Sequence, residues 1–136
     1  MVKRTFLSMS IKVKKRQSLE DILASCSDTI FPDKMGNAPV FVDSRDVDGD
    51  TPLHVMLWRN DTYAVLRLIE AGADVNAIGD MSETPLHLAV RKQDLKAVEA
   101  LLEAGANVTL SSEFGDTPIG LAKALGGDMR RLFDNS

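Results

Sequence analysis

One four-residue signature recurs in this chain at a fixed spacing. It reads Thr51-Pro52-Leu53-His54 at first, returns intact at Thr84 and returns in altered form at Thr117, so that both intervals are 33 residues. A second block, 70–76, returns in the same register at 103–109. Two different blocks that share one period indicate copies of one structural unit, and such units bury their apolar faces only by stacking on one another.

Each copy of the signature is suited to start a helix. The threonine side chain can cap the first turn, and the proline behind it occupies the first helical position, where its missing N–H is tolerated. In the first two copies, apolar residues then recur three and four positions apart, which predicts a second, amphipathic helix that ends at Gly72 or Gly105. We therefore expect paired helices, with the first of each pair over 52–59, 85–92 and 118–125.

These residues resemble the ankyrin repeat family, which has a 33-residue period and a T-P-L-H-x-A signature. Residues 84–89 match every fixed position, Met56 replaces the alanine in the first copy, and Ile119-Gly120 replaces Leu-His in the third. The resemblance covers about residues 46–133. It implies a mostly α-helical solenoid of stacked helix-turn-helix units with β-hairpin fingers, and repeats at about 46–78, 79–111 and 112–136.

The resemblance also implies roles for two kinds of residue inside each repeat. His54 and His87 would be structural, with imidazoles that bond to backbone and hydroxyl groups across neighbouring repeats. The tight turn between paired helices usually has glycine in this family, and this chain has Asn60, Gln93 and Gly126 there. Asparagine tolerates a left-handed backbone, so we expect Gln93 to strain its turn or to change its shape.

Residues 1–45 do not match the repeat, so we divide the chain into this N-terminal segment and a repeat domain over 46–136. Residues 18–26 begin with a capping serine and have helical apolar spacing, which predicts a helix that covers the first repeat. Alternation over 7–13 suggests a short strand, with 40–42 as a weakly supported partner. The expected segment is a basic arm followed by a capping helix.

Charge is distributed unevenly, although the formal net charge is only −4. Residues 1–16 contain six of the 16 basic residues and no acidic one, which leaves ten basic against 20 acidic residues in the remainder. Such an arm could bind nucleic acid or an anionic surface. A solvated arm, or an arm folded back on the acidic body, is the alternative that we favour.

Neither a membrane span nor a catalytic set is predicted. No run of about 18 apolar residues is present, and Cys26 is the only cysteine, which favours a reducing compartment; we expect a cytoplasmic protein. His54 and His87 lack a third nitrogen or sulfur ligand for zinc, and 46–50 lacks the glycine and glutamate of an EF-hand loop. We therefore predict no metal, no cofactor and no enzymatic activity.

Ankyrin-like stacks bind proteins through finger tips and the exposed, concave side of the first helices, so the resemblance implies a protein partner. Acidic finger residues beside large apolar ones predict a partner with a basic strip next to an apolar patch. The positions that match are Val47, Asp48, Asp50, Trp58, Arg59, Ile78, Asp80, Met81, Glu83, Arg91, Lys92, Glu113, Phe114, Asp116 and Leu125.

Several forms of this function stay open. The chain could act as an inhibitor or immunity-type protein that occupies a partner's surface, or as an adaptor between two proteins. It could form a homodimer through the same apolar groove. The N-terminal segment could instead fold back over Trp58, and Phe114 could pack against the C-terminal cap. Nucleic-acid binding through residues 1–16 is the weaker alternative.

Overall fold

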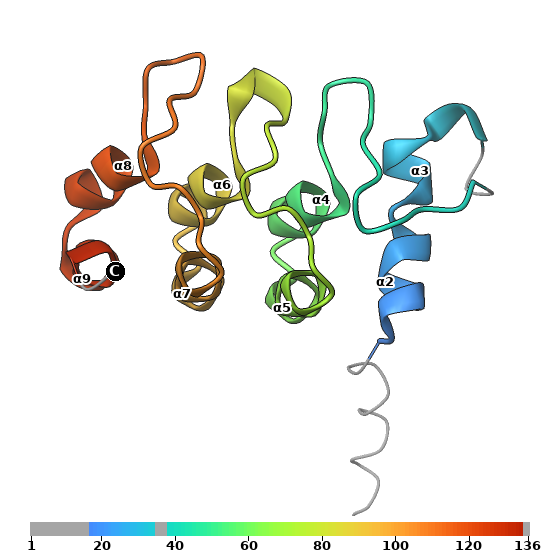
Figure 1. Cartoon of the computed structure of the whole chain (residues 1–136), viewed down its shortest axis with the longest axis horizontal. Helices are drawn as coiled ribbons and strands as arrows, with labels where there is room; N and C mark the ends of the chain where they lie inside the picture. The colour runs from blue at the N-terminus through green and yellow to red at the C-terminus, as the bar shows by residue number, and fades with distance from the viewer. Residues whose placement is uncertain (1–16, 35–37, 135–136) are drawn as a thin grey trace, which may run out of the picture.

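The computed structural model describes residues 17–34 and 38–134, and in this part of the chain helices are stacked in two rows (Figure 1). Helices α4, α6 and α8 lie side by side in one row, and α5, α7 and α9 form a second row, below the first in Figure 1, that packs against it. None of the helices in the described ranges is long and apolar enough to cross a membrane. The elements are α2 (Leu19–Ser25), α3 (Ser27–Ile30), η1 (Pro32–Lys34), α4 (Pro52–Trp58), α5 (Thr62–Glu70), η2 (Asp80–Ser82), α6 (Pro85–Arg91), α7 (Leu95–Glu103), α8 (Pro118–Leu125) and α9 (Gly127–Asp134).

The recurring threonine–proline pair starts the first helix of every repeat, as predicted. The side-chain oxygens of Thr51, Thr84 and Thr117 each accept a hydrogen bond from the backbone N–H three residues later. In the first two repeats the histidine at that third position bonds back to the threonine backbone, which completes a reciprocal cap. The expected helices are confirmed to within one residue at their C-terminal ends.

Left-handed residues turn the chain at the predicted positions. Gly72 and Gly105 both have φ near +92° just after α5 and α7, where a residue with a side chain would be strained. Between the paired helices, Asn60 and Gln93 have φ values of 60° and 56°. Gln93 therefore adopts the same left-handed turn as Asn60, so the turn keeps its shape and the expected effect of Gln93 is strain.

The core is one continuous apolar cluster that runs through all the stacked helices. Leu53 and Leu68 of the first repeat and Leu86 and Leu101 of the second are fully buried between the two rows. Burying a leucine side chain contributes about 1.5–3 kcal/mol. Small residues at equivalent places in α5 and α7, such as Ala64 and Ala97, let the rows approach closely.

Helical caps close both ends of this cluster. At the N-terminal end α2 begins after the capping residue Ser18 and packs against α5, with Ile22 and Cys26 fully buried, which confirms the predicted capping helix. Burial also raises the pKa of the Cys26 thiol. At the C-terminal end α9 packs on α7 and α8 through the buried residues Met129 and Phe133.

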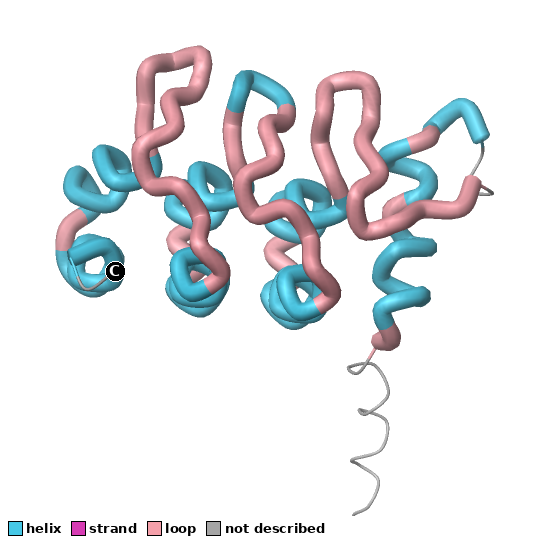
Figure 2. The backbone as a smooth tube through the Cα atoms, in the orientation of Figure 1, coloured by secondary structure: helices cyan, strands magenta, loops and turns pink. Residues whose placement is uncertain are grey.

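The predicted β-hairpin fingers were wrong in one respect, because the described residues contain no β-strand. The fingers are long loops that project on one side of the helix rows (Figure 2). Each is closed by a backbone hydrogen bond across its base, such as that from Asp46 N to Asp50 O at 2.9 Å. In the first finger the return bond is missing because the amide of Asp50 donates to the Asp46 carboxylate instead, and in the second the amide of Glu83 donates to Asp80 O.

The short strand expected over 40–42 is also not found. Val40, Phe41 and Val42 form an irregular loop and a turn, held by a bond from the Phe41 amide to the Ser44 hydroxyl. The proposed partner strand, 7–13, lies outside the described residues, as does the whole basic arm over 1–16.

Candidate functional site

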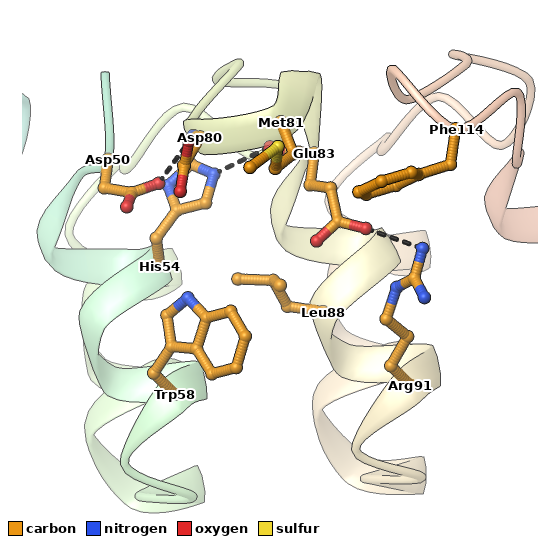
Figure 3. A pocket seen from close by; sticks show the side chains of 9 residues that line it. All are labelled: Asp50, His54, Trp58, Asp80, Met81, Glu83, Leu88, Arg91 and Phe114. Atoms are coloured by element: carbon orange, nitrogen blue, oxygen red, sulfur yellow. Dashed lines mark hydrogen bonds and ion pairs between the residues drawn. The ribbon is translucent and has the colours of Figure 1, made fainter. Parts of the chain in front are cut away.

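A pocket of about 300 Å³ lies between the fingers and the first helices of repeats one and two (Figure 3). We call it the finger–helix pocket. Its walls come from α4, α6, η2, the ends of two fingers and the tip of a third. The lining residues are Asp50, His54, Trp58, Asp80, Met81, Glu83, Leu88, Arg91 and Phe114.

The 33-residue period explains why these residues meet. Residues 33 positions apart occupy equivalent places in adjacent repeats, so Asp50 and Glu83 both precede a helix-capping threonine, and Trp58 and Arg91 both end a first helix. Because α4 and α6 pack side by side, the exposed end of one helix faces that of the next. The pocket is thus a gap between neighbouring repeats, and its chemistry depends on which residues fill equivalent positions.

His54 forms the floor of the pocket and is held as the ankyrin resemblance implied. Its Nδ1 accepts from the Thr51 amide at 3.1 Å, so Nε2 carries the proton and donates to the carbonyl oxygen of Glu83 at 3.1 Å. Burial lowers the pKa of His54, which favours the neutral ring. His87 repeats this arrangement with Thr84 and with Asp116 O at 2.9 Å. Both ring nitrogens of each histidine are therefore engaged in structural bonds.

Acidic groups from two fingers meet at one end of the pocket. The Asp50 carboxylate accepts a hydrogen bond from the Asp80 amide at 3.0 Å. Asp48 lies at the exposed tip of the first finger, and the nearby charge of Asp80, followed by smaller contributions from burial, Asp46 and Asp50, raises the pKa of its carboxyl group. This finger edge is therefore a region of mutual negative repulsion, which favours a cation nearby.

Glu83 and Asp116 were predicted to face a partner, and the structure places both in an ion-pair network with Arg91. The Arg91 Nη2 atom lies 2.7 Å from a Glu83 oxygen and 3.0 Å from an Asp116 oxygen. Glu83 is only 8% exposed. Both carboxylates are ion-paired with one arginine, so the acidic edge has fewer unpaired carboxylates than the sequence suggested.

Exposed apolar side chains line the pocket on its helix side and its finger side (Figure 3). The side chain of Trp58 is 55% exposed and that of Phe114 is 64% exposed. Met81, on the second finger, also lines the pocket and has nearly half of its surface accessible. The Lys92 ammonium group lies 5.0 Å from the centre of the Trp58 ring. No described part of the N-terminal segment lines the pocket, and Phe114 is not packed against the C-terminal cap. Large apolar side chains exposed together are typical of binding surfaces.

The pocket brings together seven of the fifteen residues predicted from the sequence, and the rest lie around it or away from it. Val47 and Glu113 are exposed on the first and third fingers, and Ile78 is exposed at the start of the second. Arg59 turns away and binds Ser25 O at 2.9 Å. Leu125 is exposed at the far end of α8.

Two residues that line the pocket were not predicted as site residues. The resemblance implied only a structural role for His54, and Leu88 belongs to the predicted helix over 85–92. Their spacing was the available signal, because His54 precedes Trp58 by four positions and Leu88 precedes Arg91 by three, which places each pair on one helix face. Both residues are mostly buried and present only a small surface to the pocket.

Stacked helix pairs with a fixed period and loops on one side define a helical-repeat solenoid. The family described as ankyrin repeats (3 copies) matches residues 14–126, and the chain belongs to this family. The match begins ahead of the recurring signature and includes α2 and α3. No curated protein matches the chain. Ankyrin repeats generally serve as protein–protein interaction modules and are typically not enzymes.

Proposed function

We propose that this chain binds a partner protein through the finger–helix pocket and the adjoining finger tips. The observation that carries the proposal is the exposure of Trp58, Met81 and Phe114 around one pocket. Tryptophan is among the residue types most often found as binding hot spots, and such residues cluster where a surface can be desolvated. A partner that covers these side chains would remove their apolar surface from water.

The charges beside the pocket support a partner with a basic strip. Asp48 is fully exposed on the first finger, and Glu113 is exposed on the third. Complementary charge accelerates encounter and is screened by salt. We expect association to slow as ionic strength rises. Changing Asp48, Asp80 and Glu113 to lysine should weaken binding, and unchanged binding would contradict this placement of the interface.

The simplest mode of action is occupation of the partner's surface, as an inhibitor or immunity-type protein would act. Self-association is the second candidate, because the same exposed residues could pack against a second copy of the chain. The single, buried Cys26 supports a reducing, cytoplasmic setting for either form.

Affinity capture from a lysate of the source cells would test the proposal, with bound proteins quantified by mass spectrometry. Wild type is compared with a Trp58→Ala, Met81→Ala, Phe114→Ala variant whose fold is checked by circular dichroism. The matched control is Phe41→Ala with Leu95→Ala, two exposed apolar residues that do not line the pocket. A protein held by wild type and the control but lost by the triple variant supports the proposal. Equal capture by all three, or no enrichment over bare resin, overturns it.

A further inference from the structure

We infer that the finger–helix pocket takes a single lysine or arginine side chain of the partner, with its cation at Asp50 and Asp80 and its aliphatic stem along Trp58 and Leu88. This inference rests on the proposed function and names the group that enters the pocket. It follows from the distribution of charge and apolar surface within the pocket.

Carboxylates are in excess at one end of the pocket. Three acidic residues and one arginine line it, and Glu83 is paired with Arg91 at 2.7 Å. Asp50 and Asp80 have no ion-pair partner among the described residues, and their side chains lie at the same end of the pocket (Figure 3). The buried, neutral His54 between them and the helices adds no positive charge at neutral pH. Arg45 adds a positive charge nearby, but its guanidinium donates to the carbonyl oxygens of Gly49 and Ile78 and forms no ion pair with either aspartate. A cation placed in the pocket would therefore meet two carboxylates.

The helix side of the pocket is suited to an aliphatic stem. Trp58 and Leu88 line the helix side and Met81 lines the finger side (Figure 3). Lysine and arginine combine a cation with three or four methylene groups, which pack on apolar surface while the charged head stays polar. Ligand pockets usually measure about 300–1,000 Å³, so a pocket of about 300 Å³ is at the small end and fits a side chain better than a cofactor.

The Trp58 ring already holds a cation of this chain. The Nζ atom of Lys92 lies 5.0 Å from the ring centre. Its hydrogen bond to the Trp58 carbonyl oxygen is long, at 3.5 Å. An ammonium group over a tryptophan ring is stabilised by the ring quadrupole. A weakly held lysine at this ring can move when a second cation arrives, and the rest of the indole remains available because Trp58 is 55% exposed.

The test begins with random 12-residue peptides displayed on phage and selected on the full chain, with counter-selection on the Trp58→Ala variant. We expect the enriched peptides to share a lysine or arginine at one fixed position. A synthetic copy of one such peptide is then compared with a version in which norleucine replaces that residue, and affinities are measured by fluorescence anisotropy. We expect norleucine to weaken binding about tenfold, as does loss of a partly buried charged hydrogen bond.

A double variant then locates the charge. The double variant Asp50→Asn, Asp80→Asn removes both charges but keeps the side-chain oxygen at residue 50 that accepts the hydrogen bond from the residue 80 amide. It should weaken binding of the basic peptide about tenfold and binding of the norleucine peptide less than twofold. The matched control, Glu99→Gln with Glu103→Gln, removes two exposed charges from α7 and should change neither.

The outcomes separate this inference from the proposed function. Failure to enrich any peptide that depends on Trp58 would overturn both. Enriched, Trp58-dependent peptides without a fixed basic residue, or a norleucine effect below twofold, would overturn the inference alone. Concentration-dependent dimerisation that the Trp58→Ala variant abolishes, measured by sedimentation velocity, would show that a second copy covers the pocket and would also overturn the inference.

Discussion

The two boundaries between repeats share the same histidine-to-carbonyl hydrogen bond but have different side chains at the exposed helix ends. At the first, between α4 and α6, His54 donates to Glu83 O at 3.1 Å, and at the second, between α6 and α8, His87 donates to Asp116 O at 2.9 Å. Trp58 ends α4 and leaves a pocket, whereas Arg91 occupies the equivalent position on α6 and forms ion pairs with the acidic residues beside it.

This difference shows that the residues that stack the repeats are not the residues that vary at the exposed surface. The signature residues, which recur every 33 positions, hold each repeat against the next, and in the first two copies all four of them are buried. The residues between them are free to vary, because they lie at exposed helix ends and finger tips. In this chain the equivalent helix-end position has an exposed tryptophan at the first boundary and, at the second, an arginine that is ion-paired with Glu83 and Asp116.

The largest expected effect is the loss of either histidine. His54→Ala and His87→Ala should each lower the free energy of unfolding by about 2–4 kcal/mol. Each variant leaves the buried threonine amide without its acceptor, removes one of the two hydrogen bonds to Glu83 O or Asp116 O, and opens a cavity. Urea unfolding followed by circular dichroism measures both. If one variant lost less than about 1 kcal/mol of unfolding free energy and the other more than about 3 kcal/mol, the two histidines would not have equivalent structural roles.

Next in size is a difference between the two helix-end positions. Arg91→Ala should destabilise the fold by about 1–3 kcal/mol, because Glu83 is left nearly buried without its counter-charge. Trp58→Ala, at the equivalent but exposed position, should change stability by less than about 0.5 kcal/mol. The same urea series compares them, and a larger loss for Trp58→Ala than for Arg91→Ala would mean that Trp58 is part of the core.

A pH dependence should follow from His54. Because burial lowers its pKa in the folded state, the unfolded chain binds the proton first as pH falls below about 6.5. The stability that His54 contributes is therefore complete above pH 6.5 and declines below it. The difference in unfolding free energy between wild type and His54→Ala should shrink between pH 7.5 and 5.5. A difference that stays constant or grows would contradict the neutral, buried ring.

The smallest expected effect concerns the tight turns. Gln93→Gly should stabilise the fold by roughly 0.5–1 kcal/mol, because glycine adopts the left-handed backbone without strain, although the unfolded chain gains entropy. Asn60→Gly should gain less, since asparagine tolerates this conformation. Thermal unfolding of both variants would rank them, and a larger gain at Asn60 would show that Gln93 is not strained.

Most of the fold could be predicted from the sequence because it repeats. Thr51 and its two copies fix the start of every first helix, and Gly72 and Gly105 fix the end of the second helices. The lack of β-hairpins could not be predicted, because the Glu83 amide bonds to Asp80 O in the second finger and because, in the first, the Asp46 carboxylate competes for the amide that a ladder would need. That competition depends on a side-chain rotamer, which periodicity does not report.

The candidate site was less predictable for a related reason. Its apolar members, Trp58, Met81 and Phe114, follow from repeat register and large side chains at exposed positions. The sequence could not indicate that Arg91 would neutralise Glu83 and Asp116, or that Arg59 would turn toward Ser25, because each depends on long, flexible side chains choosing among several partners. Register places a residue on a face, and only the packed structure shows which neighbour it binds.

The most direct test of the central claim is the affinity of the captured partner for two single variants, measured by isothermal titration calorimetry. Trp58→Ala should weaken binding at least 30-fold, as expected for a hot spot of about 2 kcal/mol. Leu125→Ala, a similarly exposed apolar residue on α8 outside the pocket, should change affinity less than twofold. Equal affinities for wild type and Trp58→Ala would show that the partner binds elsewhere and would contradict the account.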